Sequence, residues 1–348
     1  MEITVTIRNL SPIFSAAPGV KKIALDGTTD VPQAIFPLTR ARTMTVIGDS
    51  GEGALKTVRV PIVPGNTMRN LLRRSILKAV VEPALKGRAK LSIGAYAAAY
   101  AGNASGNPDG VPSSFDEIAR MRQHPFIGLF GGGPRMLKGR LMVESLYPVH
   151  VDTQRLLGEG FENMMASGVI TNVVWTRRVD PICQLGSEED VEVIEGGATA
   201  ANIWLAELTE STKAAASKRK KKGAREEVTV DEVAESGGRG LQAFNAHEVV
   251  IPGLSWVWRI ALDNPTRAQV GAVLMGLSNL TDLTIAGGHA KGYGKFVIDD
   301  ITLDGSSVWQ SGDLADSTCE YVDALAEAAD ALGAEDFEAF AASAKSAA

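Results

Sequence analysis

The sequence predicts an α+β fold in which two helices alternate with four strands. Three observations lead to this prediction. An alternating strand pattern opens the chain at residues 2–10, helical spacing of apolar residues recurs at 67–81 and 264–280, and an apolar strand follows at 295–303. With 348 residues and 45% hydrophobic content, the chain can bury a sizeable core in one large domain or two smaller ones.

The first strand, residues 2–10, places Ile3, Val5 and Ile7 on one face and polar side chains on the other. Residues 11–60 are rich in Pro, Gly, Asp and Thr, so we expect an insertion that contains a hairpin at 42–46 and 56–60. Part of it, 51–57, invites comparison with a phosphate-binding P-loop. That comparison fails because Leu55, and not glycine, precedes Lys56.

The first helix is predicted at 67–81, with Asn66 or Thr67 as its N-cap. Its polar face carries Arg69, Arg73 and Arg74, and it lacks the glutamate partners that a merely solubilising helix would have. Two interpretations stay open, a phosphate-binding face and a solvated one.

A second glycine turn lies at 126–136, between a short predicted helix at 115–123 and a predicted strand at 139–151. Three consecutive glycines in this turn indicate a close backbone approach to a ligand or to another chain. Lys138 and Arg140 add positive charge beside it.

A strand or hairpin is predicted at 168–185, with Trp175, Arg177 and Arg178 at its centre. The charge-rich stretch 211–236 follows, and it contains the basic run Lys218–Lys222. This run is typical both of a nucleic-acid patch and of a solvated, disordered loop.

The C-terminal third supplies a strand region at 248–263, a helix that starts at Asn264-Pro265, and the final strand. Without the insertions, the predicted order is βαββαβ. This is the ferredoxin-like arrangement that RNA-recognition domains also use.

Residues 285–296 pack four glycines and two lysines into a turn between the second helix and the last strand. Glycines let a backbone lie directly against a ligand, and exposed amides form an anion-binding concavity. A glycine-rich hairpin is also often only a turn that needs unusual dihedral angles. In this loop His289 could donate to a phosphate, act as an acid, or simply face solvent.

Composition excludes several classes of site. Cys183 and Cys319 are the only cysteines and lie far apart, and the four histidines are scattered, so we expect neither a disulfide framework nor a metal site. No catalytic motif and no cofactor motif appears. No apolar run is long enough to cross a membrane, so we expect a soluble, cytoplasmic protein. The net charge of -6 reflects an acidic tail, 313–338, and leaves room for a basic face elsewhere.

Four segments together resemble the RAMP superfamily of CRISPR effector complexes. Residues 64–73 resemble its "PGSSLRGxLR" helix opening, 130–133 its "LFG" turn, 248–256 its "E-x-V-x-x-G-x-x-F" strand, and 287–295 its "GGxxxxGYGR" loop. Their order and spacing are most similar to the repeated backbone subunit of class 1 effectors, the Cas seven family, in its type IV version.

This resemblance implies one RRM-like palm domain over residues 1–348, with insertions. These are a finger at about 11–60, a helical and loop insertion at 84–137, and a thumb with a flexible basic loop at 152–246, before an acidic helical tail at 313–348. It also implies copies that stack head to tail along a guide RNA, further effector subunits that cap the filament, and a target DNA or RNA that pairs with the guide.

The expected role is non-catalytic binding of RNA phosphates, because a guide whose sequence varies must be held through its backbone. An aromatic ring, Tyr293 or Trp175, would stack on a displaced base or lie buried. The predicted RNA-binding residues are Asn66, Arg69, Arg73, Arg74, Lys138, Arg140, Trp175, Arg177, Arg178, Gly288, His289, Lys291, Gly292, Tyr293 and Lys295.

Two alternatives remain. Some relatives cut target RNA with an aspartate from the loop after the first strand, so a metal-dependent endonuclease could use Asp26, Asp30 or Asp49, although none of them clearly matches the relatives' motif. In the other alternative, the glycine loops serve protein contacts in a plain interaction module.

Overall fold

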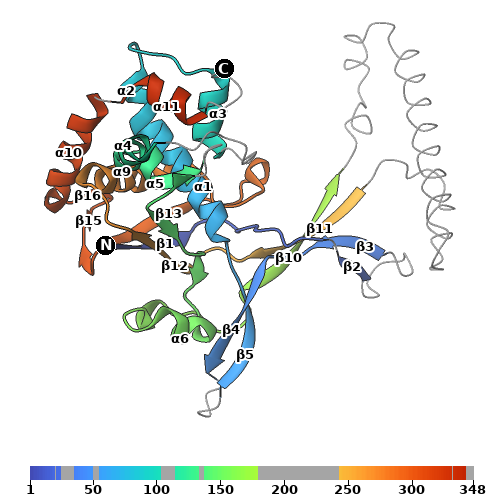
Figure 1. The fold of residues 1–348 in the computed structure, drawn as a ribbon. Coiled ribbons are helices and arrows are strands. Elements are labelled where there is room, and N and C mark those ends of the chain that lie inside the picture. Colours follow the sequence, from blue (N-terminus) through green and yellow to red (C-terminus); the bar gives the residue numbers. More distant parts are fainter. Residues whose placement is uncertain are drawn as a thin grey trace, which may run out of the picture. The chain divides into compact units, whose positions relative to one another are not determined.

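The computed structural model contains helices and antiparallel sheets, so the predicted α+β class is confirmed (Figure 1). Its contacts divide the chain into two compact units. The first comprises Met1–Pro18, Ala41–Asn172 and Val249–Ala348, and the second comprises Gly19–Arg40 and Val173–Glu248. The structure describes residues 1–19, 21–24, 35–49, 55–102, 114–132, 137–178, 243–330 and 332–341.

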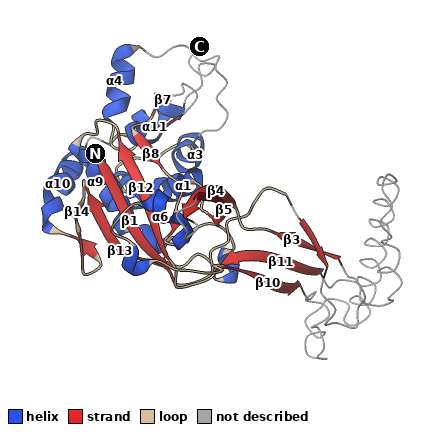
Figure 2. Ribbon diagram, turned by 90° about the horizontal axis from the view of Figure 1, so that it is seen from below, coloured by secondary structure: helices blue, strands red, loops and turns tan. Residues whose placement is uncertain are grey.

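The main sheet of the first unit has β1 at its centre. It consists of β1 (Glu2–Asn9), β8 (Leu141–Val143), β9 (Tyr147–Pro148), β12 (Ser255–Leu262), β13 (Phe296–Leu303) and β14 (Ser306–Ser307). Val5 lies opposite Trp258 on one side and Ile301 on the other. The strand order is β13-β1-β12-β8, and each of these pairings is antiparallel (Figure 2).

Both faces of this sheet are covered. Ile7, Trp256 and Trp258 are fully buried in the large core cluster. Val257 points to the other face, as the period-2 geometry of a strand requires, and it packs with Leu157 in a separate small cluster. In β1, Ile3, Val5 and Ile7 are fully buried and Arg8 is exposed, so the predicted alternation is confirmed except at Thr6, which the cover on the second face also buries.

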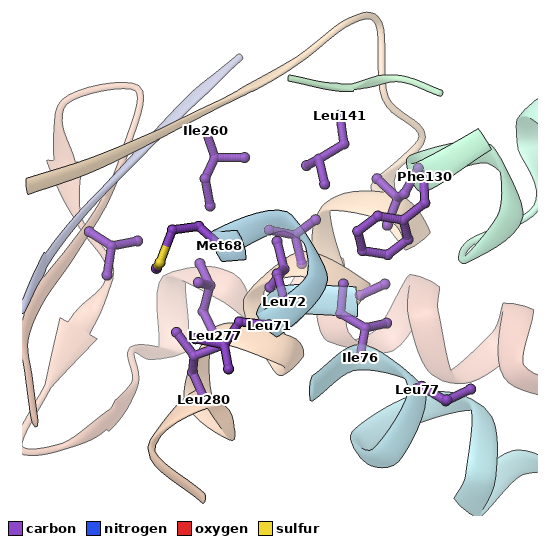
Figure 3. Packing of buried hydrophobic residues seen from close by; sticks show 14 of the residues in the cluster. Met68, Leu71, Leu72, Ile76, Leu77, Phe130, Leu141, Ile260, Leu277 and Leu280 are labelled. Carbon is purple, nitrogen blue, oxygen red and sulfur yellow. The ribbon is translucent and has the colours of Figure 1, made fainter. Parts of the chain in front are cut away.

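Two long helices, α1 (Gly65–Ile76) and α9 (Arg267–Ser278), pack against the sheet and against each other (Figure 3). In chain order α1 lies between β1 and β8, and α9 lies between β12 and β13. A Cβ atom at Gly276 would lie 2.3 Å from Cγ1 of Ile76, so only glycine permits this close helix contact.

The start of α1 differs from the prediction of a cap at Asn66 or Thr67. The helix begins at Gly65, and Pro64 at the cap position has no side chain that could bond the first amides. The Gly65 amide donates instead to Oγ of Ser145 at 3.2 Å. A hydroxyl from a distant segment thus satisfies one of the free amides at the start of the helix.

The second helix also starts later than predicted. Asn264 has a φ of +45°, which lies outside the helical region. Thr266 is the N-cap, because its Oγ1 accepts from the Gln269 amide at 3.2 Å and Oε1 of Gln269 accepts from the Thr266 amide at 3.0 Å. This reciprocal capping box outweighs the preference of proline for the first helical position.

The predicted strand at 139–151 is interrupted, and only β8 and β9 form within it. Between them, Leu146 exchanges two backbone hydrogen bonds with Val63, at 2.9 and 3.2 Å. The chain there bonds to the residues just before α1, and it therefore cannot continue as one strand along β12.

Other described elements of the first unit confirm the predicted hairpin and the helix at 115–123. The strands are β4 (Thr43–Asp49), β5 (Leu55–Pro61), β6 (Gly131–Gly132), β7 (Leu137–Lys138), β15 (Trp309–Gln310) and β16 (Asp313–Leu314). The helices are a π-helical turn (Leu77–Val81), α2 (Glu82–Leu85), α3 (Ile93–Ala101), α4 (Phe115–Gln123), α5 (Ile127–Phe130), α6 (Gln154–Leu157), α10 (Cys319–Asp330) and α11 (Ala334–Ala341). None of the described helices has both the length and the apolar character needed to cross a membrane.

The second unit holds a four-stranded sheet in the order β10-β11-β3-β2. Its strands are β2 (Lys21–Ala24), β3 (Ile35–Thr39), β10 (Thr171–Arg178) and β11 (Ala243–Val250). Arg40 and Glu248 form an ion pair at 3.6 Å. The prediction of a strand at 168–185 corresponds to β10 up to Arg178, whereas the rest of that range and the Lys218–Lys222 run lie outside the described residues.

Candidate nucleic-acid interface

The glycine loop after α9 is held by the segment that directly follows β1. Gly287 donates its amide to the Phe14 carbonyl at 2.9 Å, and Gly294 donates to the Pro12 carbonyl at 2.9 Å. The Lys295 amide bonds Oγ of Ser11 at 2.8 Å. Residues far apart in the sequence therefore meet here, and the loop has a defined backbone course.

Three glycines in this loop have a positive φ for different reasons. At Gly294 (φ +81°) an added Cβ would lie 2.2 Å from the Ile285 carbonyl oxygen, and at Gly288 (φ +83°) it would lie 2.6 Å from the Tyr293 ring. At Gly292 (φ +75°) nothing lies within 4 Å. The loop's own packing thus explains two glycines, while the backbone at the third is open to an approaching ligand.

A 3-10 turn, His289–Lys291, forms the outer part of the loop. The amides of Lys291 and Tyr293 both return to the Gly288 carbonyl, at 2.8 and 3.3 Å. The amides of Gly288, His289 and Ala290 donate no hydrogen bond to any residue that the structure describes. These three donors lie together in the chain, as in an anion-binding backbone concavity.

The side chains of the loop divide into exposed and buried ones. Lys291, Lys295 and His289 are exposed, and Nδ1 of His289 shares a hydrogen bond with Oγ1 of Thr284. Tyr293 is 8% exposed and lies beneath Gly288, so its ring is part of the protein interior. Of the predicted loop residues, the lysines and His289 are therefore placed to meet an anion, and the Tyr293 ring is not exposed for base stacking.

The arginines of α1 face the protein more than the solvent. Arg69 donates from Nη2 to the Phe130 carbonyl. Arg73 is 5% exposed, with its guanidinium 4.6 Å from the centre of the Phe130 ring, and Arg74 lies 4.7 Å from the centre of the Tyr100 ring. Burial, together with the nearby charge of Arg69, lowers the pKa of Arg73 to about 10.

Nε of Arg73 and Nε of Arg74 are buried and find no hydrogen-bond partner within the described part of the chain. Arg140 is also committed internally, because Nε donates to the Arg122 carbonyl at 3.0 Å and Nη1 to the Asp263 carbonyl at 3.1 Å. Lys138, by contrast, is exposed on β7. Among the predicted cations of α1, β7 and the residues just after β7, Lys138 is thus the one that most clearly faces solvent.

The predicted site residues fall into separate groups. Arg69, Arg73 and Lys138 gather around the turn at Phe130, and Asn66 is exposed at the start of α1. Across the described ranges, no hydrogen bond, ion pair or ring contact joins the α1 arginines to the glycine loop. No direct contact therefore supports the prediction that α1 and the glycine loop form one groove.

The remaining predicted site residues belong to the second unit. Trp175 is 38% exposed on β10. Arg177 and Arg178 lie on the same strand, but their side chains are outside what the structure describes.

The comparisons with known proteins find a likeness among solved structures but none among family models or curated proteins. No family model matches the sequence, and no curated protein matches it. Among solved structures, a chain described as "Type IV-B CRISPR Complex" is similar over 90% of this chain and 96% of its own, with 16% sequence identity and a TM-score of 0.45. The function proposed below therefore rests on the chain's own residues and contacts.

Sequence reasoning missed Asn9, which is fully buried and makes four hydrogen bonds. Its Nδ2 donates to the carbonyls of Ser11 and Ile251, both at 2.9 Å, and its Oδ1 accepts from the Leu254 amide at 3.0 Å and the Trp256 indole at 3.1 Å. It fixes the start of the segment that holds the glycine loop. The signal was present, because Asn9 occupies the next inward position after Ile3, Val5 and Ile7.

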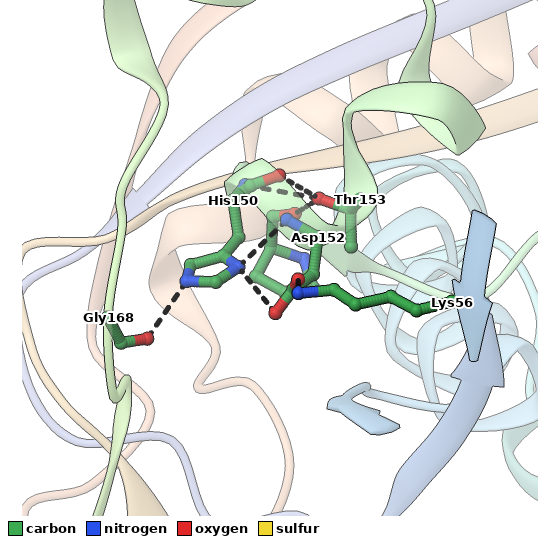
Figure 4. Close-up of polar contacts among 6 residues, drawn as sticks. Lys56, His150, Asp152, Thr153 and Gly168 are labelled. Atoms are coloured by element: carbon green, nitrogen blue, oxygen red, sulfur yellow. Dashed lines mark hydrogen bonds and ion pairs between the residues drawn. The ribbon is translucent and has the colours of Figure 1, made fainter. Parts of the chain in front are cut away.

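A second missed cluster surrounds His150, which is 4% exposed (Figure 4). Nε2 of His150 lies 2.9 Å from the Gly168 carbonyl oxygen, and Nδ1 accepts from the Asp152 amide at 3.1 Å. The backbone amide of His150 donates to Oγ1 of Thr153 at 3.1 Å. Asp152 also pairs with Lys56 of β5 at 3.5 Å. Both ring nitrogens of His150 are engaged, and the ion pair of Asp152 with Lys56 ties this cluster to the β4–β5 hairpin.

The aspartates of the endonuclease alternative cannot be placed. Asp26 and Asp30 lie outside the described residues, and Asp49 ends β4 with a side chain that is not described. A group of three His, Cys, Asp or Glu side chains able to hold a metal does not occur within the described ranges.

Proposed function

We propose that this chain is a non-catalytic backbone subunit of a CRISPR effector complex that binds guide RNA through its phosphates, independently of sequence. The observation that carries the proposal is the glycine loop. Its backbone is held by the segment after β1, three neighbouring amides lack acceptors within the described ranges, and Lys291 and Lys295 are exposed beside them. Oriented amides and lysines together suit a phosphate oxygen.

The strand order supports the same proposal. An antiparallel sheet in the order β13-β1-β12-β8, with α1 and α9 in the two helical positions, is the arrangement expected of a ferredoxin-like palm. The segments that resemble RAMP motifs occupy the opening of α1, the turn at Phe130, the connection from the end of β11 to the start of β12, and the glycine loop. We therefore propose the type IV backbone subunit, whose copies stack head to tail on the guide with other subunits at the ends.

Within this proposal, the burial of Arg73 changes which residues are expected to contact the RNA phosphates. A phosphate cannot reach a guanidinium that is 5% exposed and packed on Phe130 without a local rearrangement. The backbone contacts would therefore come from Lys138, Lys291 and Lys295, with Asn66 at the helix start. The α1 arginines would support the turn at Phe130.

RNA affinity measured over a range of salt concentrations tests the proposal. Two unrelated single-stranded RNAs of equal length should bind with similar affinity. The double variant K291A/K295A should make the fall of log affinity with log salt less steep, by about 0.7 for each phosphate that the variant no longer neutralises. Arg267→Ala is the matched control, because that arginine is 71% exposed and pairs with Glu320 on another surface. If the salt dependence of RNA affinity is equally steep in K291A/K295A and in Arg267→Ala, the glycine loop does not bind RNA phosphates.

Assembly and chemistry are tested separately. Negative-stain images and particle masses should show multi-copy assemblies whose length follows the length of the added RNA. Incubation of the assembled protein with complementary RNA and Mg²⁺ should leave that RNA intact. A monomer with no affinity for RNA would overturn the proposal, and cleavage of the complementary strand would overturn its non-catalytic part.

A further inference from the structure

Helix α3 carries no charged residue, although one of its faces is open to solvent. Ala95, Ala98 and Ala99 are buried, while the opposite face exposes Ile93 (91%), Gly94, Tyr96 (39%) and Ala97. A surface helix normally has charged side chains on its outer face, and one that is apolar all round is normally covered on both sides. The outer face of α3 is therefore typical of a protein contact surface.

A groove of about 880 Å³ runs between this face and the segment formed by the π-helical turn and α2. Its floor is apolar, with Leu77, Val81 and Leu85 buried in the core beneath it. All of the residues that line it belong to the first unit. The floor thus continues the hydrophobic core outward to the exposed Ile93.

The rim of the groove is basic. Lys78, Lys86 and Lys90 line it and are exposed. The only carboxylate among its lining residues is Glu82, and it accepts a hydrogen bond from the Tyr96 hydroxyl at 2.9 Å. Three lysines around an apolar floor, on a chain whose net charge is -6, make a local surface that complements carboxylates next to apolar side chains.

We propose that this groove binds an acidic amphipathic helix of a partner protein. The partner's apolar stripe would cover Ile93 and Tyr96, and carboxylates on both sides of the stripe would meet the three lysines, as in helix-in-groove recognition. Gly94 lacks a side chain and that of Ala97 is small, so they permit a close approach of the two helices. A nucleic-acid backbone fits less well, because it would pair the lysines but leave the apolar floor in water.

The test uses the full-length protein and a fluorescein-labelled helical peptide of about 16 residues, with leucines at i, i+3, i+4 and i+7 and glutamates on both flanks. One comparison peptide has lysine in place of each glutamate, and another has serine in place of each leucine. The glutamate peptide should bind at least about tenfold more tightly than either. Lys86→Glu and Ile93→Asp should each weaken it by about tenfold or more, and added salt should weaken it further.

Val169→Asp is the matched control, because Val169 is 84% exposed in the same unit and does not line the groove. It should leave peptide affinity unchanged, and thermal unfolding should show that all variants remain folded. If the glutamate peptide binds no better than the lysine peptide, or if Ile93→Asp leaves its affinity unchanged, the proposal is wrong.

Two further outcomes would assign the groove to a different occupant. Self-association that Ile93→Asp abolishes would identify a second copy of this chain. RNA that displaces the peptide, with RNA affinity lowered by Lys86→Glu, would identify nucleic acid. Either result overturns the proposal. Because K291A/K295A leaves the groove intact, it should leave peptide binding unchanged, so this inference can hold or fail independently of the RNA proposal.

Discussion

Replacing Gly294 by alanine should disrupt the glycine loop, whereas the same change at Gly292 should be mild. The two residues have similar backbone angles, with φ of +81° and +75°. They differ in their surroundings. An alanine Cβ at 294 would meet the Ile285 carbonyl oxygen at 2.2 Å and the Ile285 amide nitrogen at 3.0 Å, and at 292 it would meet nothing within 4 Å. The pair therefore separates backbone strain from steric collision.

The contacts set the expected difference in the free energy of unfolding. An alanine with a left-handed backbone costs about 1–2 kcal/mol, and this term applies to both variants. At 294 the Ile285 carbonyl must also retreat by about 1 Å to restore van der Waals separation. That movement strains the hydrogen bonds from Ile285 to Gly294 and from Gly294 to Pro12, both 2.9 Å, each of which contributes about 1 kcal/mol. We therefore expect a loss of about 3–4 kcal/mol for Gly294→Ala and about 1–2 kcal/mol for Gly292→Ala.

Urea unfolding followed by tryptophan fluorescence measures both free energies, and RNA affinity provides a second readout. Gly294→Ala should weaken RNA binding about tenfold or more, because the amides of the loop lose their common orientation. Gly292→Ala should change RNA affinity by less than about threefold, since an added methyl group there only narrows an open approach.

Equal destabilisation by the two variants would refute this reasoning. It would mean that backbone strain alone decides the cost, and that the loop yields easily at Ile285. Unchanged RNA affinity in a destabilised Gly294→Ala protein would uphold the packing argument, but it would remove the loop from the RNA interface.

Three further predictions follow from the buried polar groups. Asn9→Leu leaves two donors and two acceptors without partners, so urea unfolding should show a loss of about 3–5 kcal/mol. Burial lowers the pKa of His124 from 6.5 to about 4. As pH falls through 6.5, only the unfolded state gains a proton, so about 3 kcal/mol of the free energy of unfolding should be lost by pH 4. Urea unfolding of His124→Asn across this pH range should not show that loss. Arg73→Met removes a buried charge that pairs with no carboxylate among the described residues, and it keeps the packing on Phe130, so urea unfolding should show a change within about 1 kcal/mol or a gain, and RNA affinity should stay the same.

Different results would contradict each of these predictions. A loss below about 1 kcal/mol for Asn9→Leu would mean that water satisfies the abandoned groups. Parallel pH profiles for the wild type and His124→Asn would mean that other groups cause the acid sensitivity. A flatter salt dependence of RNA binding in Arg73→Met would show that the guanidinium reaches phosphate after all.

Elements with a strong local pattern were predictable. The alternation at 2–10 and the apolar run at 295–303 correspond to β1 and β13, and the prediction of a helix at 115–123 coincides with α4. Helix starts were less predictable. At the start of α1 the Gly65 amide bonds Ser145, and no local signal reveals a partner that lies 80 positions away.

The α1 arginines illustrate the same limit for function. In the sequence, Arg69, Arg73 and Arg74 at helical spacing predict a solvent-facing binding surface. Its burial depends on Phe130 and Tyr100, which come from later segments and lie over Arg73 and Arg74. Asn9 shows the reverse case, since the strand pattern places it on the inward face but says nothing of the four groups that it bonds.

By itself, the sequence determined the α+β class and the places of the elements with a strong local pattern, such as β1, α4 and β13. These properties depend on side-chain period and local dihedral preference, and both act over a few neighbouring residues. Only the tertiary structure decided which cations face solvent, which glycines are needed for packing, and that the glycine loop rests on the segment after β1. The physical reason is that burial and hydrogen bonding of a side chain depend on chain segments far away in the sequence.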